Sequence, residues 1–155
     1  MLWRDIGEYQ WPIVESGGNS SATIRDELNE YDIDTILFVG DYDPSGLSIE
    51  RTWRDYFPHV DFIRVALTLD QIDHYGLQKL AGKATDSNAK RFVAEHGELF
   101  QVEVDAIPPD ELRRLVRTSI ESRMDLSMFE TVVAEENRQR DELDDLLAEF
   151  DGEAA

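Results

Sequence analysis

The sequence predicts an α/β domain with a mostly parallel sheet of about four strands flanked by helices, followed by a C-terminal helical extension. Thr35-Ile36-Leu37-Phe38-Val39 is a continuous apolar run, as expected for a strand buried on both faces of a parallel sheet. Strand-like runs alternate with stretches of helical spacing, which is the order of βαβ units. From residue 126 onward the apolar residues keep helical spacing only, which predicts the extension.

The strands are expected at residues 11–15, 35–39, 62–67 and 100–104. The first predicted strand is followed by residues 16–20, a stretch of serine, glycine and asparagine that predicts a turn. The fourth alternates apolar and polar residues, which is typical of a sheet edge or a half-exposed face.

Helices are expected between and after these strands. Asp43 followed by Pro44 predicts a helix start, because aspartate caps free amides and proline suits the first helical position. Thr68 is the second predicted cap. The other helices are expected around Ile24, Leu28 and Tyr31, at 88–96, from Pro108 through Ile120, and at 126–150. We predict an α/β domain over residues 1–123 and a C-terminal helix or helical arm over residues 124–155.

Composition excludes several kinds of site. The chain has no cysteine, so disulfides, thiolate zinc sites and cysteine nucleophiles are ruled out, and its three histidines form no close ligand pair in sequence. No apolar run approaches membrane-spanning length and the first residues lack a signal-peptide pattern, so we expect no membrane association and a cytoplasmic location. The net charge of -19 opposes nucleic-acid binding unless a basic strip, a metal ion or a partner helps.

An acidic pair follows the strand at 35–39. Asp41 and Asp43 stand two residues apart, so in an extended segment both carboxylates point the same way and can share one hard cation. Ligands of open parallel sheets bind beyond the carboxyl ends of the strands. Oxygen ligands favour Mg²⁺ or Mn²⁺, and Gly46 leaves room for a close approach of backbone or phosphate. An Asp-x-Asp in so acidic a chain also occurs by chance, and Asp43 alone can be only a helix cap.

Two stretches together resemble the Toprim family. Ile13-Val14-Glu15-Ser16-Gly17 places a glutamate after one apolar strand, and Ile36 to Asp43 places Asp-x-Asp after a later one. The stretch Gly40-Asp41-Tyr42-Asp43-Pro44-Ser45-Gly46 is most similar to the Toprim domain of the topoisomerase VI A subunit and its meiotic double-strand-break relatives. Residues 64–68, 83–87 and 102–109 resemble stand-alone Toprim-like proteins of prokaryotes and their mobile elements.

The resemblance implies a Toprim, Rossmann-like fold and a Mg²⁺-dependent activity on nucleic-acid phosphodiesters, such as a nuclease or a topoisomerase-related step. It makes Asp41, Asp43 and Glu15 the metal-binding and catalytic residues, with Glu15 exchanging a proton with the attacking or leaving oxygen. Topoisomerases of this type carry a nucleophilic tyrosine on a winged-helix domain ahead of the Toprim domain, and only ten residues precede Trp11 here. We therefore expect the nucleophile to come from water or from another chain.

Further residues are candidates for accessory roles. Glu103 and Asp105 follow the fourth predicted strand and can add a ligand to the same pocket, although Asp105 also suits a turn. Lys83 lies in a polar loop and can contact phosphate or stand on the surface. A partner protein or a second copy of the chain is a candidate partner for the C-terminal helix.

Two other functions remain open from the sequence. A Toprim-fold module without catalysis would bind a metal or a partner protein only. A phosphatase of the haloacid dehalogenase type also places Asp-x-Asp after an apolar strand, but Ser45 departs from its threonine or valine, and no later paired-aspartate loop is evident.

Overall fold

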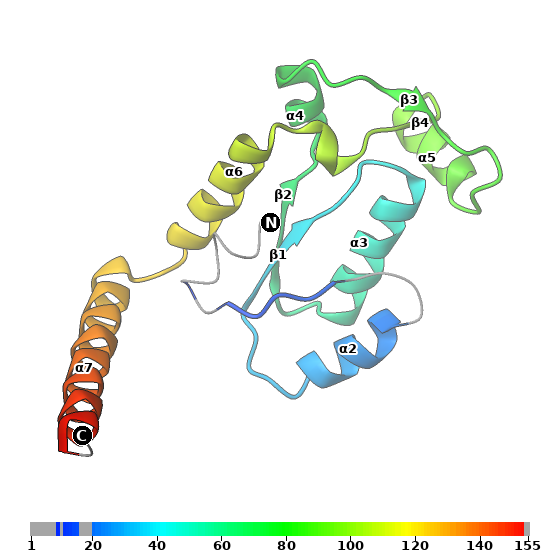
Figure 1. The fold of residues 1–155 in the computed structure, drawn as a ribbon. Coiled ribbons are helices and arrows are strands. Elements are labelled where there is room, and N and C mark those ends of the chain that lie inside the picture. The colour runs from blue at the N-terminus through cyan, green and yellow to red at the C-terminus, as the bar shows by residue number, and fades with distance from the viewer. Residues whose placement is uncertain (1–8, 10, 16–19, 154–155) are drawn as a thin grey trace. The chain divides into compact units, whose positions relative to one another are not determined.

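The computed structural model describes residues 9, 11–15 and 20–153 (Figure 1). The predicted turn at 16–20 falls mostly outside this range. The elements in chain order are α2 (Ser20–Leu28), β1 (Thr35–Val39), α3 (Pro44–Tyr56), β2 (Asp61–Ala66), α4 (Leu69–His74), β3 (Leu80–Ala81), α5 (Ala89–His96), β4 (Phe100–Gln101), the 3-10 turn η2 (Val104–Ala106), α6 (Pro109–Glu121) and α7 (Leu126–Glu153). The predicted mixed α/β class with a C-terminal helix is confirmed.

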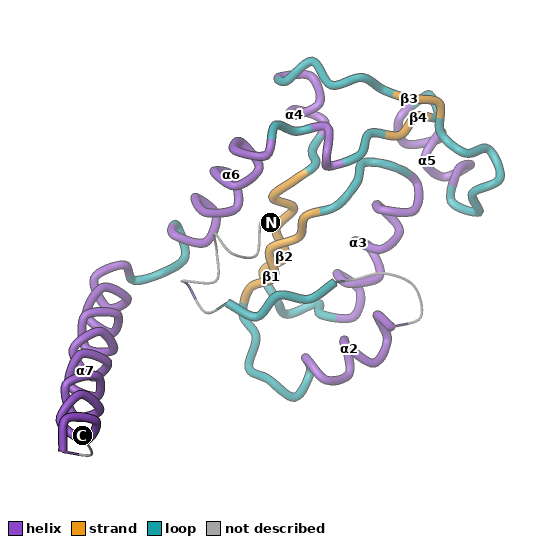
Figure 2. Tube along the Cα trace, in the orientation of Figure 1, coloured by secondary structure: helices purple, strands orange, loops and turns teal. Residues whose placement is uncertain are grey.

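Two of the four predicted strands form over nearly their full length, at 35–39 and 61–66, and the other two do not (Figure 2). β1 and β2 pair in parallel from Thr35–Asp61 to Val39–Ala66, so the two central predictions are confirmed. The fourth predicted strand is wrong beyond Gln101, because β4 pairs antiparallel with β3 and the chain then turns into η2. The mostly parallel sheet of four strands is therefore reduced, in the described part of the chain, to one parallel pair and one short antiparallel pair.

Residues 11–15 form no strand. Pro12 lacks the N–H that a ladder position must donate, which is a physical reason for the wrong prediction. Val14 nevertheless packs against the apolar cluster on β1 and α3, so the segment is held by side chains rather than by backbone pairing.

Apolar side chains of β1, α3, β2 and the loop between α3 and β2 form one core cluster: Phe38, Trp53, Phe57, Val60 and Phe62. Ile24 and Leu28 of α2 pack against this cluster as predicted, whereas Tyr31 lies beyond the end of α2 and is 70% exposed. A second cluster joins the end of β2 to α4, α5 and the β4 region, with Leu67, Ile72, Phe92, Val102 and Ile107 fully or almost fully buried.

The contacts divide the chain into two compact units, Met1–Ser119 and Ile120–Ala155. The first contains β1, β2 and the acidic pair, and the second contains α7. No helix in the described ranges has the length and apolar character needed to cross a membrane.

Tyr75, at the end of α4, is tied to Glu111 in α6. Its hydroxyl donates to Glu111 Oε1 over 2.5 Å, and Arg114 donates to both oxygens of the same carboxylate. The hydrogen bonds from Arg114 and then from Tyr75 lower the pKa of Glu111 to about 2. The ordinary value is 4.5.

Replacing Tyr75 with phenylalanine is expected to raise the pKa of Glu111, although Arg114 keeps it below its ordinary value. Because the folded-state pKa is depressed, this carboxylate contributes stability above pH 4.5 that is lost as the pH falls toward 2. Tyr75→Phe should therefore unfold at lower urea than the wild type at neutral pH, and the difference should vanish near pH 2. NMR titration of Glu111 checks the pKa. Tyr56→Phe, which loses a hydroxyl bonded to Asp26, is the matched control.

Candidate metal centre

Asp41 and Asp43 follow the carboxyl end of β1. The pairing of β1 with β2 continues past Val39, because the Gly40 amide donates to the Ala66 carbonyl over 2.8 Å and the Leu67 amide donates to the Gly40 carbonyl over 2.9 Å. Asp41 and Asp43 therefore follow directly after the point at which the pairing of β1 with β2 ends. This is the edge at which open α/β sheets bind ligands.

The carboxylate of Asp41 is oriented by a backbone amide from a distant segment. Its Oδ1 accepts the Val104 N–H over 2.8 Å. Between the two aspartates, Tyr42 exchanges two backbone hydrogen bonds with Val102, at 2.8 and 3.1 Å, and its ring is buried. The turn after β1 is therefore attached to the segment that follows β4.

Asp43 caps α3, as predicted. Its Oδ1 accepts the Gly46 N–H over 2.6 Å, and Pro44 occupies the first turn, where a missing N–H has no cost. A carboxylate at this position is also favoured by the positive end of the helix dipole. The capping role and a metal-binding role are compatible, because the hydrogen bond uses one of the two carboxylate oxygens.

Gly46 is buried and leaves no room for a side chain. A Cβ at this position would lie 2.4 Å from the Asp41 carbonyl oxygen and 3.1 Å from Asp43 Oδ1. The close approach that the sequence predicted at Gly46 is therefore made by the backbone of Asp41. Gly46 thus allows the start of α3 to pack against the Asp41 carbonyl.

Arg64 holds the back of the same turn. Its guanidinium donates to the carbonyls of Gly40, Asp41 and Leu67. It also forms an ion pair with Glu50 of α3, and the side chains are only 9% and 12% exposed. The five donors of arginine in a fixed fork suit this arrangement of several acceptors. One side chain thereby connects the ends of β1 and β2 to α3.

Ser45 joins the turn to the loop before α5. Its hydroxyl donates to Asp86 Oδ2 over 2.5 Å, and Asp86 Oδ1 accepts the Asn88 amide over 2.7 Å. These hydrogen bonds, with that of Ser45 the larger cause, lower the pKa of Asp86. Lys83 is exposed, and its carbonyl accepts the Asp86 N–H. Lys83 thus lies in a loop that is hydrogen-bonded to residues 40–46, which we call the acidic turn.

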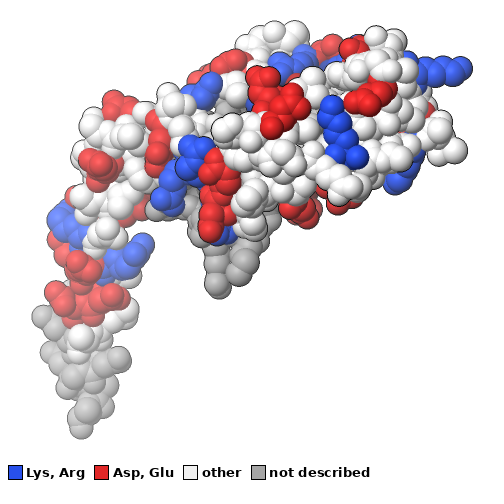
Figure 3. Space-filling model, turned by 90° about the horizontal axis from the view of Figure 1, so that it is seen from above, with Lys and Arg blue, Asp and Glu red and all other residues white. Residues whose placement is uncertain are grey.

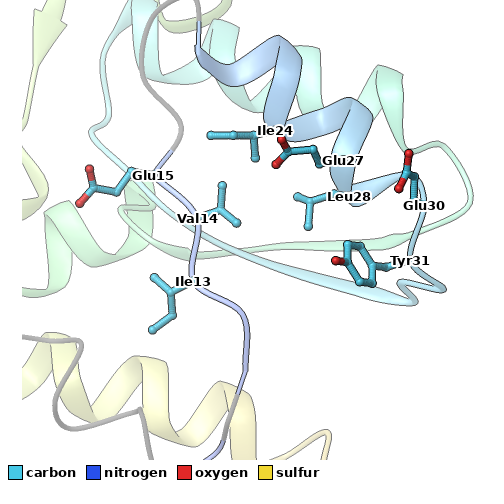
Figure 4. Close-up of a pocket in the computed structure, with 8 residues that line it drawn as sticks. All are labelled: Ile13, Val14, Glu15, Ile24, Glu27, Leu28, Glu30 and Tyr31. Carbon is cyan, nitrogen blue, oxygen red and sulfur yellow. The ribbon is translucent and has the colours of Figure 1, made fainter.

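Glu15 lies with α2. It lines a pocket of about 530 Å³ whose other lining residues are Ile13, Val14, Ile24, Glu27, Leu28, Glu30 and Tyr31. Figure 4 shows its carboxylate pointing away from the apolar side chains of Val14, Ile24 and Leu28. Glu15 is exposed, and no hydrogen bond or ion pair joins it to Asp41 or Asp43, all three being described residues.

Glu103 and Asp105 flank the point that meets Asp41. Glu103 precedes η2, Asp105 lies within it, and both side chains are exposed. The group between them that contacts Asp41 is the Val104 amide. The structure thus brings this segment to the acidic turn through its backbone.

Asp41 and Asp43 supply carboxylate oxygens, the ligand type that Mg²⁺ prefers. Within residues 9, 11–15 and 20–153, no group of three or more histidines, aspartates or glutamates is arranged to hold a metal ion. Mg²⁺ usually keeps several water ligands and needs only one or two protein carboxylates. Oδ1 of Asp41 and of Asp43 each accepts a backbone N–H, and no described residue donates to either Oδ2. One oxygen of each aspartate is thus available to a cation.

Two residues that contact this turn, Arg64 and Asp86, were not predicted from the sequence. Arg64 interrupts the apolar strand Phe62-Ile63-Arg64-Val65-Ala66, and a charged residue in such a run was the available signal. Asp86 had no local signal, because its partner Ser45 is 41 residues away in the chain.

The charges on the surface are mixed. On the face shown in Figure 3, lysine and arginine side chains lie beside aspartate and glutamate. In α6, Arg113 and Arg114 form ion pairs with Asp110 and Glu111. Comparison with protein-family models, curated proteins and solved structures gave no match. A function is therefore argued from the residues of this chain.

Proposed function

We propose that the chain is a Toprim-type Mg²⁺-binding protein that acts on nucleic-acid phosphodiesters. The observation that carries the proposal is the arrangement of Asp41 and Asp43 beyond the carboxyl end of β1, each with one oxygen bonded to a backbone N–H. The motif that resembles the family, Gly40 to Gly46, is the same segment in which Gly46 packs against the Asp41 carbonyl.

Asp41 and Asp43 would hold the ion, Mg²⁺ or Mn²⁺. When bound, the ion supplies positive charge that stabilises a phosphate and its developing negative charge. It would also reduce the repulsion between phosphate and a chain of net charge -19. The backbone amides of Val104 and Gly46 keep each aspartate oriented, and Arg64 keeps the turn attached to α3.

Glu15 has the role of proton exchange in this proposal, and water or another chain supplies the nucleophile. Its exposed carboxylate can take up and release a proton. The role requires Glu15 to reach the same phosphodiester as Asp41. Lys83, Glu103 and Asp105 remain accessory candidates, because their segments are attached to the acidic turn through Asp86 and Val104.

A second candidate is a Toprim-fold module that binds a metal ion or a partner without catalysis. The observation that favours it is that no group of three or more histidines, aspartates or glutamates among the described residues is arranged to hold a metal ion. A site with two protein ligands can bind an ion without positioning a general base.

Cleavage assays separate the two candidates. Supercoiled DNA, single-stranded DNA and a small phosphate monoester are incubated with the wild type, Asp41→Ala and Glu15→Ala in Mg²⁺ or Mn²⁺. We expect the wild type to cleave DNA. Glu15→Ala should cleave it about 100-fold or more slowly, because this variant lacks the proton-exchanging carboxylate. Glu27→Ala, on a neighbouring pocket residue, is the control for Glu15. Metal binding without cleavage would favour the non-catalytic module, and hydrolysis of the monoester alone would favour a phosphatase.

A further inference from the structure

We propose that α7 pairs with α7 of a second copy of the chain as an antiparallel coiled coil. The inference is independent of the acidic turn, because it concerns the unit Ile120–Ala155 only. α7 is one helix of 28 residues from Leu126 to Glu153.

Most of the large apolar side chains of α7 are exposed, whereas Phe129 and Val133 are half-buried. Six large ones have between 43% and 67% of their surface exposed: Leu126, Met128, Val132, Leu143, Leu146 and Leu147. Exposed apolar side chains gathered on one element indicate an interaction surface rather than the scattered exposure that is usual on proteins. Helices in proteins also obtain most of their stability from packing an apolar face.

The apolar residues of α7 fit a heptad repeat in part, with the exposed Val132, Leu143 and Leu146 and the half-buried Phe129 at its core positions. With Phe129 as position a, the a positions are Phe129, Glu136 and Leu143, and the d positions are Val132, Gln139 and Leu146. Leu126, Val133 and Leu147 all fall at the neighbouring e position. Apolar residues at a and d with a period of 3.5 form the seam of a coiled coil. The seam has two apolar segments with a polar centre at Glu136 and Gln139.

The polar centre selects the orientation. In a parallel pair, Glu136 would face Glu136 of the second copy at a core position, which buries two like charges. In an antiparallel pair, a faces d, so Glu136 faces Gln139 of the second copy, whose amide can donate to the carboxylate. The same register places Phe129 against Leu146 and Val132 against Leu143, so apolar residues meet apolar residues.

The two glutamates beside the seam are partly neutralised within each helix. Glu135 and Glu142 occupy g positions, and Arg138 donates hydrogen bonds to both of them. Glu135 also accepts from Gln139. These bonds lower the pKa of Glu135 and keep a cation close to both carboxylates. Mutual repulsion of these glutamates between two copies is thereby reduced.

Sedimentation equilibrium of the full chain tests the pairing. The wild type is expected to have the mass of a dimer, and Leu143→Glu should lower the mass twofold. Ala134→Glu adds the same charge at an f position on the opposite face and should remain dimeric. Val132→Glu, in the other apolar segment, is a second disrupting variant. Near-UV circular dichroism of the tryptophans, all of which precede residue 54, checks that the first unit stays folded. A monomeric wild type, or equal masses for Leu143→Glu and Ala134→Glu, would overturn the pairing.

Introduced cysteines test the orientation, because the chain has none of its own. Val132→Cys and Leu143→Cys chains are oxidised separately and as a mixture. Antiparallel pairing predicts disulfide-linked dimers in the mixture and little in either variant alone. Efficient cross-linking of each variant with itself would overturn the antiparallel arrangement.

Discussion

Replacing Arg64 with methionine is expected to lower the free energy of unfolding by about 2 to 4 kcal/mol, somewhat less than the loss of one partner from an isolated buried ion pair, because Arg54 still pairs with Glu50. The variant leaves the Glu50 carboxylate, 12% exposed, without its closer cation and removes the donor from three carbonyls. A change of this size is a large part of the stability of a small domain. Urea unfolding at neutral pH measures it.

Two matched variants separate the effect of burial from the effect of the guanidinium geometry. Arg91→Met makes the same change in the exposed ion pair with Glu95 and should cost about 1 kcal/mol or less. Arg64→Lys keeps the charge beside Glu50 but not the planar fork, so we expect a loss between those of the other two variants. Equal unfolding curves for Arg64→Met and Arg91→Met would contradict the role given to Arg64.

Gly46→Ala is the second change with a large expected effect, a loss of about 3 kcal/mol. Helix propensity alone would favour alanine by about 1 kcal/mol, so the sign of the effect decides between propensity and crowding. The new Cβ would lie 2.4 Å from the Asp41 carbonyl oxygen, which is backbone and cannot rotate away. The start of α3 or the turn at Asp41 must therefore shift.

Ser48→Ala is the control for Gly46→Ala, because it lies in the same helix and reports propensity without the crowded contact. It should be neutral or slightly stabilising. Urea unfolding of both variants provides the comparison. A Gly46→Ala protein as stable as the wild type would show that the close packing against Asp41 is not needed.

The features that depend on neighbouring residues were predicted correctly from the sequence. The apolar run at 35–39 and the Asp43-Pro44 helix start were correct, because strand burial and helix capping depend on neighbouring residues. Thr68 forms the capping box with Gln71 for the same reason. The site residues Asp41, Asp43 and Gly46 were brought together because they belong to one short turn.

The sequence failed where distant segments had to be paired. Residues 100–104 have the composition of a strand, yet Val102 makes only an isolated bridge to Tyr42 and the chain turns at Val104. Nothing local shows that the Val104 amide donates to Asp41, 63 residues away. The position of Glu15 relative to the aspartates depends in the same way on sheet pairing, which residues 11–15 do not make.

Binding of Mg²⁺ tests the central claim most directly. Isothermal titration with Mg²⁺, and then Mn²⁺, compares the wild type with Asp41→Asn, Asp43→Asn and Asp55→Asn. Asparagine keeps an acceptor for the Val104 amide and can still cap α3, so the first two variants should remain folded. Asp55 is exposed at the other end of α3 and controls for the general attraction of cations to an acidic chain. We expect the wild type and Asp55→Asn to bind one ion equally and Asp41→Asn and Asp43→Asn to bind it at least about tenfold more weakly, or 1.4 kcal/mol. Equal binding by all four proteins would contradict a metal centre at Asp41 and Asp43.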